Sequence, residues 1–284
     1  MDSVYATYLL DLAASEAELM GDRKSADHWR AKRDEIKAAV REKFYWNKEY
    51  GYAVDSRSAQ GANAAMIYFK AAPQTEYPEL IEAIQADIKR WNNHLSTGSR
   101  LTYPLFSVLS ANGRIDEAVW MLTRKEYPGF LSMLDYADTM SEMWPLTNAP
   151  AVVAHCQLEG YSEIGKWFGD DLFGIRPDFN TPGFKHFFIS PQLPQDLEFA
   201  HYEFETGYGP AKAAWKKTPA GTDYEIRIPP NASASVAFEV NKGQTIYEAG
   251  RKVEDGVFIK SEGRNEAGAA VYRLQPGVWQ FEVR

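Results

Sequence analysis

The periodicity of the apolar residues changes once along the chain, and this change limits the fold more than any other feature. Up to about residue 180, apolar side chains recur three or four positions apart, as on one face of a helix. From Gly183 onward they alternate with polar residues or form short blocks between Gly, Pro and Asn residues, as in strands. The sequence therefore predicts helices over residues 1–180 and a β-domain over residues 181–284.

The predicted helices come in pairs. Apolar residues predict a first helix that ends near Gly21 and a second from Trp29 to Phe44. Further helices are predicted at 59–71, at 80–91, on both sides of the Asn112–Gly113 turn, and at 151–173. Successive helical hairpins predict an α/α array, and a row of only about seven helices would leave an end face uncovered. We therefore expect further hairpins upstream of these residues.

At least seven strands are predicted after the helices. They are FKHFFI, LEFAHYEFE, AKAAWKK, YEIRIP, ASVAFEV, AVYRL and VWQFEV, separated by Gly, Pro and Asn turns. Short strands at this spacing are typical of a β-sandwich. The expected fold is thus a partial toroid of helical hairpins followed by an antiparallel β-sandwich.

Composition excludes several classes of partner. The formal net charge of -8 among 284 residues argues against nucleic acid and anionic membranes, which call for clustered Lys and Arg. The single cysteine, Cys156, cannot form an internal disulfide, and neither metal-site spacing nor a cofactor motif is found. Without an 18-residue apolar run or a signal peptide, a cytoplasmic protein with a neutral, hydroxyl-rich partner is expected.

One loop between predicted helices is crowded with acidic and aromatic residues. The stretch LDYADTMSEMWP carries three carboxylates, at Asp135, Asp138 and Glu142, beside Tyr136 and Trp144. Carboxylates can take part in acid–base chemistry or hold hydroxyl groups, and aromatic rings can pack against the apolar face of a ligand. They are equally compatible with solvated loop residues and core packing.

Several segments in a fixed order resemble glycoside hydrolase family 78, the α-L-rhamnosidases. They are HLSTG (94–98), NGRIDEA (112–118), YPGFLSML (127–134), TMSEMW (139–144), WFGDDLFGIRPD (167–178), PGFKHFFISP (182–191) and TGYGPAKAAW (206–215). The resemblance covers nearly the whole chain. It implies the second half of an (α/α)6 catalytic toroid, followed by the C-terminal β-sandwich.

The resemblance also implies a chemistry. TMSEMW is similar to the family segment that holds the general base, which makes Glu142 the candidate base of an inverting hydrolysis. Trp144 would then lie against the apolar face of a 6-deoxy sugar. Ser141 departs from the family, which often has Trp there. The competing interpretations are a loop carboxylate paired with Arg for Glu142 and core packing for Trp144.

Five further residues are candidates for substrate binding. Asp138 and Tyr136 lie in the loop beside the base, and His155 resembles a family position that lines the sugar pocket. Gln60 opens a helix after an irregular loop, and Arg100 follows the HLSTG turn, both at positions that face the cavity in such toroids. The alternatives are a capping role for Asp138, a buried His155, and structural roles at the toroid rim for Gln60 and Arg100.

The general acid is not found in this sequence. In the family it lies in the first half of the toroid, and no carboxylate here matches its motif. We therefore expect weak or absent hydrolysis of rhamnose-containing glycosides by the chain alone, unless a complementary N-terminal half supplies the acid. A non-catalytic carbohydrate-binding or structural fragment that self-associates is the alternative. A polysaccharide lyase fits less well, because it calls for basic residues.

Overall fold

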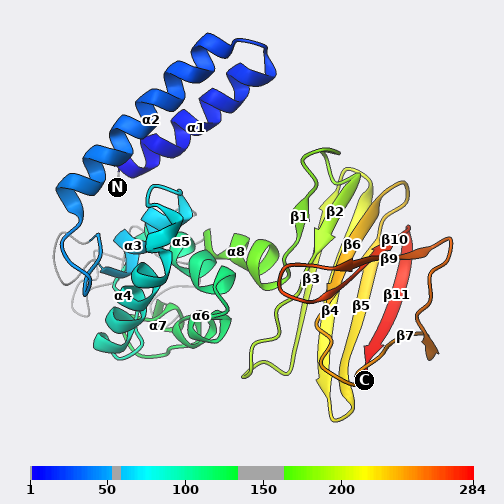
Figure 1. Cartoon of the computed structure of the whole chain (residues 1–284). Coiled ribbons are helices and arrows are strands. Elements are labelled where there is room, and N and C mark those ends of the chain that lie inside the picture. Colours follow the sequence, from blue (N-terminus) through cyan, green and yellow to red (C-terminus); the bar gives the residue numbers. More distant parts are fainter. Residues whose placement is uncertain (1, 53–58, 134–162) are drawn as a thin grey trace. The chain divides into compact units, whose positions relative to one another are not determined.

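The computed structural model describes residues 2–52, 59–133 and 163–284. The chain divides into two compact units, residues 1–164 and residues 165–284. The first is helical and the second is built of β-sheets, as the change of periodicity predicts (Figure 1). Residues 165–180 thus belong to the second compact unit. The sequence-based boundary between residues 180 and 181 refers to the change of periodicity and stays a prediction.

The first two helices form the predicted hairpin. Helix α1 (Asp2–Leu19) and helix α2 (Arg23–Phe44) lie side by side and antiparallel (Figure 1). Gly21 turns the chain with φ of +79°, a conformation that glycine adopts without a steric cost. Asp22 then caps α2 by accepting a hydrogen bond from Ser25 N at 3.0 Å, and this bonding lowers the pKa of Asp22.

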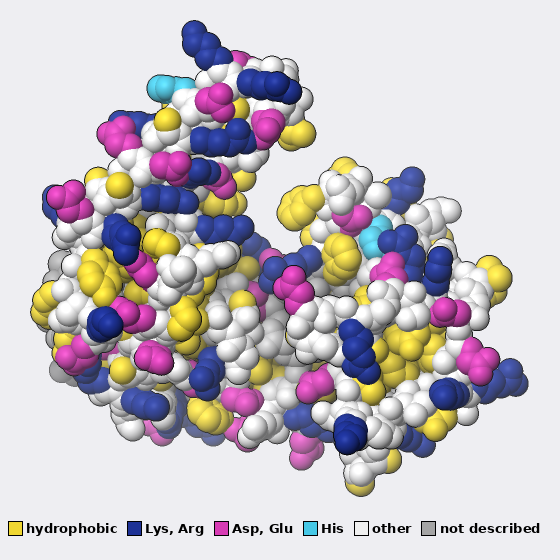
Figure 2. Space-filling model, viewed as in Figure 1, with side chains coloured by type: hydrophobic (Ala, Val, Ile, Leu, Met, Phe, Trp, Pro, Cys, Tyr) yellow, Lys and Arg dark blue, Asp and Glu magenta, His cyan; other side chains and the backbone are white. Residues whose placement is uncertain are grey.

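Helix α1 buries little of its apolar surface. Its buried residues are Val4, Thr7 and Ala14. Large apolar side chains on the same helix are exposed, including Leu9 at 47% and Leu12 at 49% of their surface. Hydrophobic side chains stand between charged ones on the hairpin in Figure 2. Exposed apolar groups of this size along one helix are typical of an interaction surface.

The middle helices form the core of the helical unit. They are α3 (Ala59–Tyr68), the 3-10 helix η1 (Gln74–Glu76), α4 (Tyr77–Arg90), α5 (Ser99–Ala111), α6 (Ile115–Leu122) and α7 (Phe130–Met133). Helix α3 packs against both α4 and α5, and nearly all of its residues are buried. Its small side chains, such as Ala64 and Ala65, allow this close approach. The Asn112–Gly113 turn between α5 and α6 is confirmed, with φ of +69° at Gly113.

Only the end of the helix predicted at 151–173 is described, as α8 (Ile164–Trp167) and the π-helix η4 (Phe168–Leu172). Trp167 and Phe173 are fully buried. Gly169 lies against the ring of Tyr202, where an added Cβ would come within 3.1 Å of the phenol oxygen. This segment therefore packs within the β-unit.

The β-unit contains two sheets. Their strands are β1 (Arg176–Pro177), β2 (His186–Ile189), β3 (Phe199–Thr206), β4 (Gly209–Thr218), β5 (Gly221–Ile228), β6 (Ser233–Phe238), β7 (Ile246–Glu248), β8 (Arg251–Lys252), β9 (Ile259–Arg264), β10 (Ala270–Leu274) and β11 (Gly277–Val283). One sheet has the order β1-β2-β6-β10-β9 and the other β3-β4-β5-β11-β7-β8. The pairings are antiparallel except for β2 with β6, which run parallel.

All seven predicted strands are confirmed, and their side chains make the core. Inward-facing residues of β4, β5 and β11, namely Trp215, Tyr224 and Phe281, are almost completely buried. Phe281 packs on Phe238 of the other sheet with ring centroids 4.7 Å apart. The four strands beyond the prediction are short or, like β9, exposed along their length.

The described residues contain no helix with the length and apolar character needed to cross a membrane. They also contain no group of three or more His, Cys, Asp or Glu side chains arranged to hold a metal ion.

Candidate functional site

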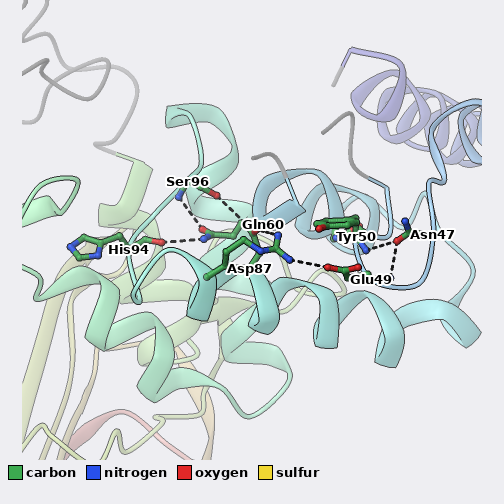
Figure 3. A network of polar contacts seen from close by, with 9 residues as sticks. Asn47, Glu49, Tyr50, Gln60, Asp87, His94 and Ser96 are labelled. Carbon is green, nitrogen blue, oxygen red and sulfur yellow. Dashed lines mark hydrogen bonds and ion pairs between the residues drawn. The ribbon is translucent and has the colours of Figure 1, made fainter. Parts of the chain in front are cut away.

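Five of the predicted site residues fall outside the described ranges. They are Tyr136, Asp138, Glu142, Trp144 and His155, and their roles stay predictions. The other two, Gln60 and Arg100, belong to helices α3 and α5, and side chains of α3 form hydrogen bonds with the loops at residues 45–52 and 91–98. These loops and the side chains that hold them form the described part of the candidate site (Figure 3).

Gln60 fixes the loop before α5. Its side chain is fully buried, and its amide nitrogen donates to the carbonyl oxygen of His94 at 3.1 Å. Its amide oxygen accepts from Ser96 N, also at 3.1 Å. Both polar ends of Gln60 are therefore engaged by residues 94–96 in this structure. That geometry supports the rim role left open by the sequence.

Asn63 fixes the loop before α3 in the same way. Its side-chain oxygen accepts from Tyr52 N at 2.7 Å, and its nitrogen donates to the carbonyl oxygen of Tyr50 at 2.9 Å. Gly51 between them has φ of +60°, and a side chain there would collide with Asn63. Two buried amides on α3 thus hold two separate loops.

A buried carboxylate strengthens this frame from α4. Asp87 is 1% exposed and accepts from the guanidinium of Arg90 at 2.9 Å and from Ser96 Oγ at 3.3 Å. Burial raises the pKa of Asp87, while Arg90 and Ser96 oppose that rise. Because its oxygens are engaged by these partners, Asp87 fits a positioning role for the loop at residues 94–96.

An aromatic pair lies on the loop before α3. The rings of Trp46 and Tyr50 stack with centroids 4.6 Å apart, and Trp46 exposes half of its surface. Arg90 lies 4.8 Å from the centroid of Tyr50 on the ring face and also pairs with Glu49 at 3.3 Å. The side-chain oxygen of Asn47 shapes this loop, because it accepts hydrogen bonds from the backbone nitrogens of Glu49 and Tyr50. Such a pair offers a flat surface to a sugar ring.

Two further tyrosines of this region donate to carboxylates. Tyr52 donates to Glu76 at 2.7 Å, and Glu76 also pairs with Arg41. Tyr45 donates to Glu79, and that bond raises the pKa of Tyr45 to about 12. Burial, followed by the bond to Glu76, raises the pKa of Tyr52. Both phenols therefore remain protonated near neutral pH and act as hydrogen-bond donors.

His94 is held in one orientation by backbone carbonyl groups. Its Nδ1 lies 3.1 Å from the oxygen of Trp91 and 3.0 Å from that of Asn92. Since a carbonyl only accepts, Nδ1 carries a proton and donates it to these oxygens. Nε2 is buried and has no hydrogen-bond partner among the residues that the structure describes. The His94 ring thus fixes the start of the HLSTG segment against the preceding turn.

A mainly apolar hollow of about 290 Å³ lies where α1, α2, α3 and α5 meet. Its walls include Val4, Phe44, Met66 and Leu101, and Thr97 adds a hydroxyl. Its volume is close to the lower end for small-molecule sites. Arg100 does not line this hollow and is exposed on α5.

Sequence reasoning did not single out Asn63 or Asp87. Both are polar residues within apolar helical stretches, AQGANAAMIY and YPELIEAIQADIKR. A polar side chain on the buried face of a helix must find partners, and this is the signal that would have identified them. The described site thus consists of a hydrogen-bonded rim, an exposed aromatic pair and an apolar hollow.

Comparison with known families divides the chain in two. Residues 1–172 match the model of the bacterial alpha-L-rhamnosidase 6 hairpin glycosidase domain. Residues 174–252 match that of the bacterial alpha-L-rhamnosidase C-terminal domain. The two matches follow each other in the order of the helical and β-sheet parts.

Similar sequences include two proteins named alpha-L-rhamnosidase. The one from Alteromonas sp. (strain LOR) is 28% identical over 76% of this chain and 24% of its own length. The one from Streptomyces avermitilis is 25% identical over 72% of this chain and 19% of its own length. The aligned part of the chain thus spans about a quarter or less of these curated relatives.

Solved structures share the fold. The alpha-L-rhamnosidase from Dictyoglumus thermophilum superposes with a TM-score of 0.82 and 23% identity, over 95% of this chain and 30% of that one. The Streptomyces avermitilis enzyme, solved in complex with L-rhamnose, gives a TM-score of 0.79 and 23% identity, over 98% of this chain and 26% of that one. The chain thus spans less than a third of the length of each of these solved proteins. With its helical part and its β-sheet part matched in order, the chain belongs to the bacterial α-L-rhamnosidase family, glycoside hydrolase family 78, of which it represents the C-terminal part.

Proposed function

We propose that this chain is part of an inverting α-L-rhamnosidase that hydrolyses terminal α-L-rhamnosides. The observation that carries the proposal is the match of the six-hairpin glycosidase domain over residues 1–172. The named activity of the relatives and the L-rhamnose complex of the Streptomyces avermitilis enzyme support a rhamnose-containing glycoside or oligosaccharide as the substrate.

In this proposal Glu142 is the general base. It removes a proton from a water molecule, which attacks the anomeric carbon from the face opposite to the leaving group. Trp144 lies against the apolar face of the sugar, and Asp138, Tyr136 and His155 bind its hydroxyl groups. The loops held by Gln60 and Asn63 are proposed to form part of the rim of the sugar site.

The general acid is proposed to come from helical hairpins outside this chain. The exposed apolar side chains of α1, among them Leu9 and Leu12, support a partner that covers this helix. A complementary N-terminal half of the toroid would cover them and bring the acid to Glu142. The chain alone is then expected to hydrolyse rhamnosides weakly or not at all.

The same exposed face supports a second candidate function. A non-catalytic carbohydrate-binding or structural fragment would cover α1 by self-association, since two copies can bury the same apolar residues against each other. The two functions differ in what they require of Glu142: only the first depends on its carboxylate.

The test measures release of p-nitrophenol from p-nitrophenyl α-L-rhamnoside by the chain alone and by the longest polypeptide that contains it. In the longer polypeptide, Glu142→Gln is expected to lower kcat by about a hundredfold to ten-thousandfold, because it removes general-base catalysis. Glu16→Gln, an exposed carboxylate on α1, is the control and leaves kcat unchanged. Proton NMR should show the β-anomer of rhamnose first. An α-anomer, or full activity of Glu142→Gln, contradicts the proposal, and an inactive longer polypeptide favours the second function.

A further inference from the structure

The six-stranded sheet of the β-unit has an outer face that is hollowed. Along β4, β5 and β11 the residues Trp215, Tyr224 and Phe281 face the core, so their sequence neighbours face outward. The register places these neighbours in two rows across four strands. The first row is Phe199, Lys216, Asp223 and Glu282, and the second is His201, Ala214, Glu225 and Gln280.

The second row has a short side chain at its centre. Ala214 projects only a methyl group between the longer side chains of His201 and Glu225, its partners on β3 and β5. The result is a hollow of about 570 Å³, within the range of small-molecule sites. Three inter-strand spacings make it about 14 Å wide across the strands. This width accommodates more than one sugar ring.

The rim of this hollow, which we call the β-face hollow, carries one large apolar group. Phe199 exposes 63% of its surface, although burial would stabilise a phenylalanine. A flat exposed ring of this kind can pack against the C–H groups of a pyranose. Among the outward-facing residues that line the β-face hollow, Ala214 is the one other apolar residue. The β-face hollow therefore lacks the clustered apolar anchors of a protein–protein interface.

The charges of the β-face hollow nearly cancel. Glu225 pairs with Lys212 at 2.9 Å, and Glu282 pairs with Arg284 at 2.7 Å. The remaining charged groups are Lys216 and Asp223, which oppose each other on β4 and β5. One cation beside one anion favours a neutral ligand and disfavours a polyanion.

The polar groups that remain are suited to hydroxyl groups. No salt bridge or side-chain hydrogen bond is found for Lys216, Asp223, His201 or Gln280 among the residues that the structure describes. The Asp223 carboxylate accepts, the Lys216 ammonium donates, and the Gln280 amide does both. A sugar offers hydroxyl groups of both kinds around an apolar ring face.

We infer that the β-face hollow binds a segment of a neutral oligosaccharide or polysaccharide, with one ring against Phe199 and its neighbour over Ala214. This binding site is built from residues of the β-unit alone and does not require hydrolysis. It goes beyond the proposed function, because it gives the β-unit a carbohydrate-binding role of its own.

The experiment is affinity electrophoresis of the full chain in native gels that contain arabinoxylan, galactomannan, mixed-linkage β-glucan or, as the acidic probe, polygalacturonate. Retardation is expected in at least one neutral gel. Phe199→Ala should weaken that binding about tenfold, equivalent to about 1.4 kcal/mol. Phe258→Ala is the matched control, because Phe258 is also 63% exposed but lies outside the hollow.

A second pair of variants tests the shape of the site. Ala214→Trp fills the floor of the β-face hollow and should abolish retardation, whereas Val278→Trp, on the same outer face but outside the hollow, should retain it. Unchanged thermal unfolding of Phe199→Ala guards against a misfolded variant. Glu142→Gln should retain retardation, so a failure of the proposed hydrolysis and a failure of this site are distinguishable. Absence of retardation in every neutral gel, retardation by polygalacturonate alone, or equal effects of the two Phe variants overturns the inference.

Discussion

The two units of this chain differ in how completely they bury their apolar residues. In the β-unit, side chains alternate along the longer strands, and the inward set closes a core around Phe238 and Phe281. In the helical unit, α1 leaves Leu9 and Leu12 half exposed while buried amides on α3 hold the loops. The difference indicates that the β-unit is stabilised by its own core, whereas the first hairpin leaves large apolar side chains of α1 exposed.

The largest effect is expected from truncating the core of the β-unit. Phe281→Ala should lower the free energy of unfolding by about 3–5 kcal/mol, because it removes a buried ring and leaves a cavity. Val278→Ala, on the same strand but 58% exposed, should change it by less than about 0.5 kcal/mol. Urea denaturation followed by tryptophan fluorescence measures both. Similar losses in the two variants would show that the β-unit is not organised around this core.

Gln60 tests the polar frame of the helical unit. Gln60→Leu should lower the free energy of unfolding by about 2–4 kcal/mol, because Ser96 N and the carbonyl of His94 lose their buried partner. Gln74→Leu, at an exposed position in η1, is the matched control. If both variants are equally stable and only Gln60→Leu impairs rhamnoside hydrolysis, Gln60 is a ligand-binding residue and not part of the rim.

A third comparison uses the pH dependence of the β-unit. His186 is buried between Ser233 and Ser235, with Glu262, Arg273 and Asp178 nearby. Burial lowers the pKa of His186 below its ordinary value of 6.5, and Arg273 adds to this shift. The unfolded chain therefore binds the proton more readily, and the free energy of unfolding falls as the pH drops below about 6.5.

His186→Gln should flatten the dependence on pH in this range. His201→Gln, at an exposed position on β3, is the control and should leave the dependence as it is in the unmodified chain. Denaturant titrations at pH 5, 6 and 7 provide the measurement. A slope that is unchanged in His186→Gln would assign the pH dependence to other groups.

The smallest effect on stability is expected on α1. Leu12→Gln should change the free energy of unfolding by less than about 0.5 kcal/mol, because the side chain is already half exposed. It should, however, reduce any concentration-dependent association seen by sedimentation velocity. A large loss of stability would mean that Leu12 belongs to a core, and the contrast between the two units would no longer hold.

The sequence was informative where periodicity reports burial. The first hairpin, the Asn112–Gly113 turn and seven strands follow from local pattern, and the structure confirms them. Strand β9 was missed because five of its six residues are exposed, so it shows no alternation. The parallel pairing of β2 with β6 depends on tertiary contacts that no local pattern reveals.

The candidate site was less predictable. Glu142 was assigned through the family resemblance, and its position lies outside the described residues. Gln60 was correctly placed near the start of a helix, but its partners are 34 and 36 residues away. The spacing of residues within one helix cannot reveal a hydrogen bond to a partner so far away in the sequence. The role of Asp87 is likewise hidden in the sequence, because its partner Ser96 lies on the loop after α4 and reaches it only in the folded chain.

Gln60 and Asn63 lie three residues apart on α3, so a single turn of helix carries both loops. Substitutions can therefore change the side chains of either loop one at a time, whereas the spacing between the two loops is set by α3, to which both are bonded.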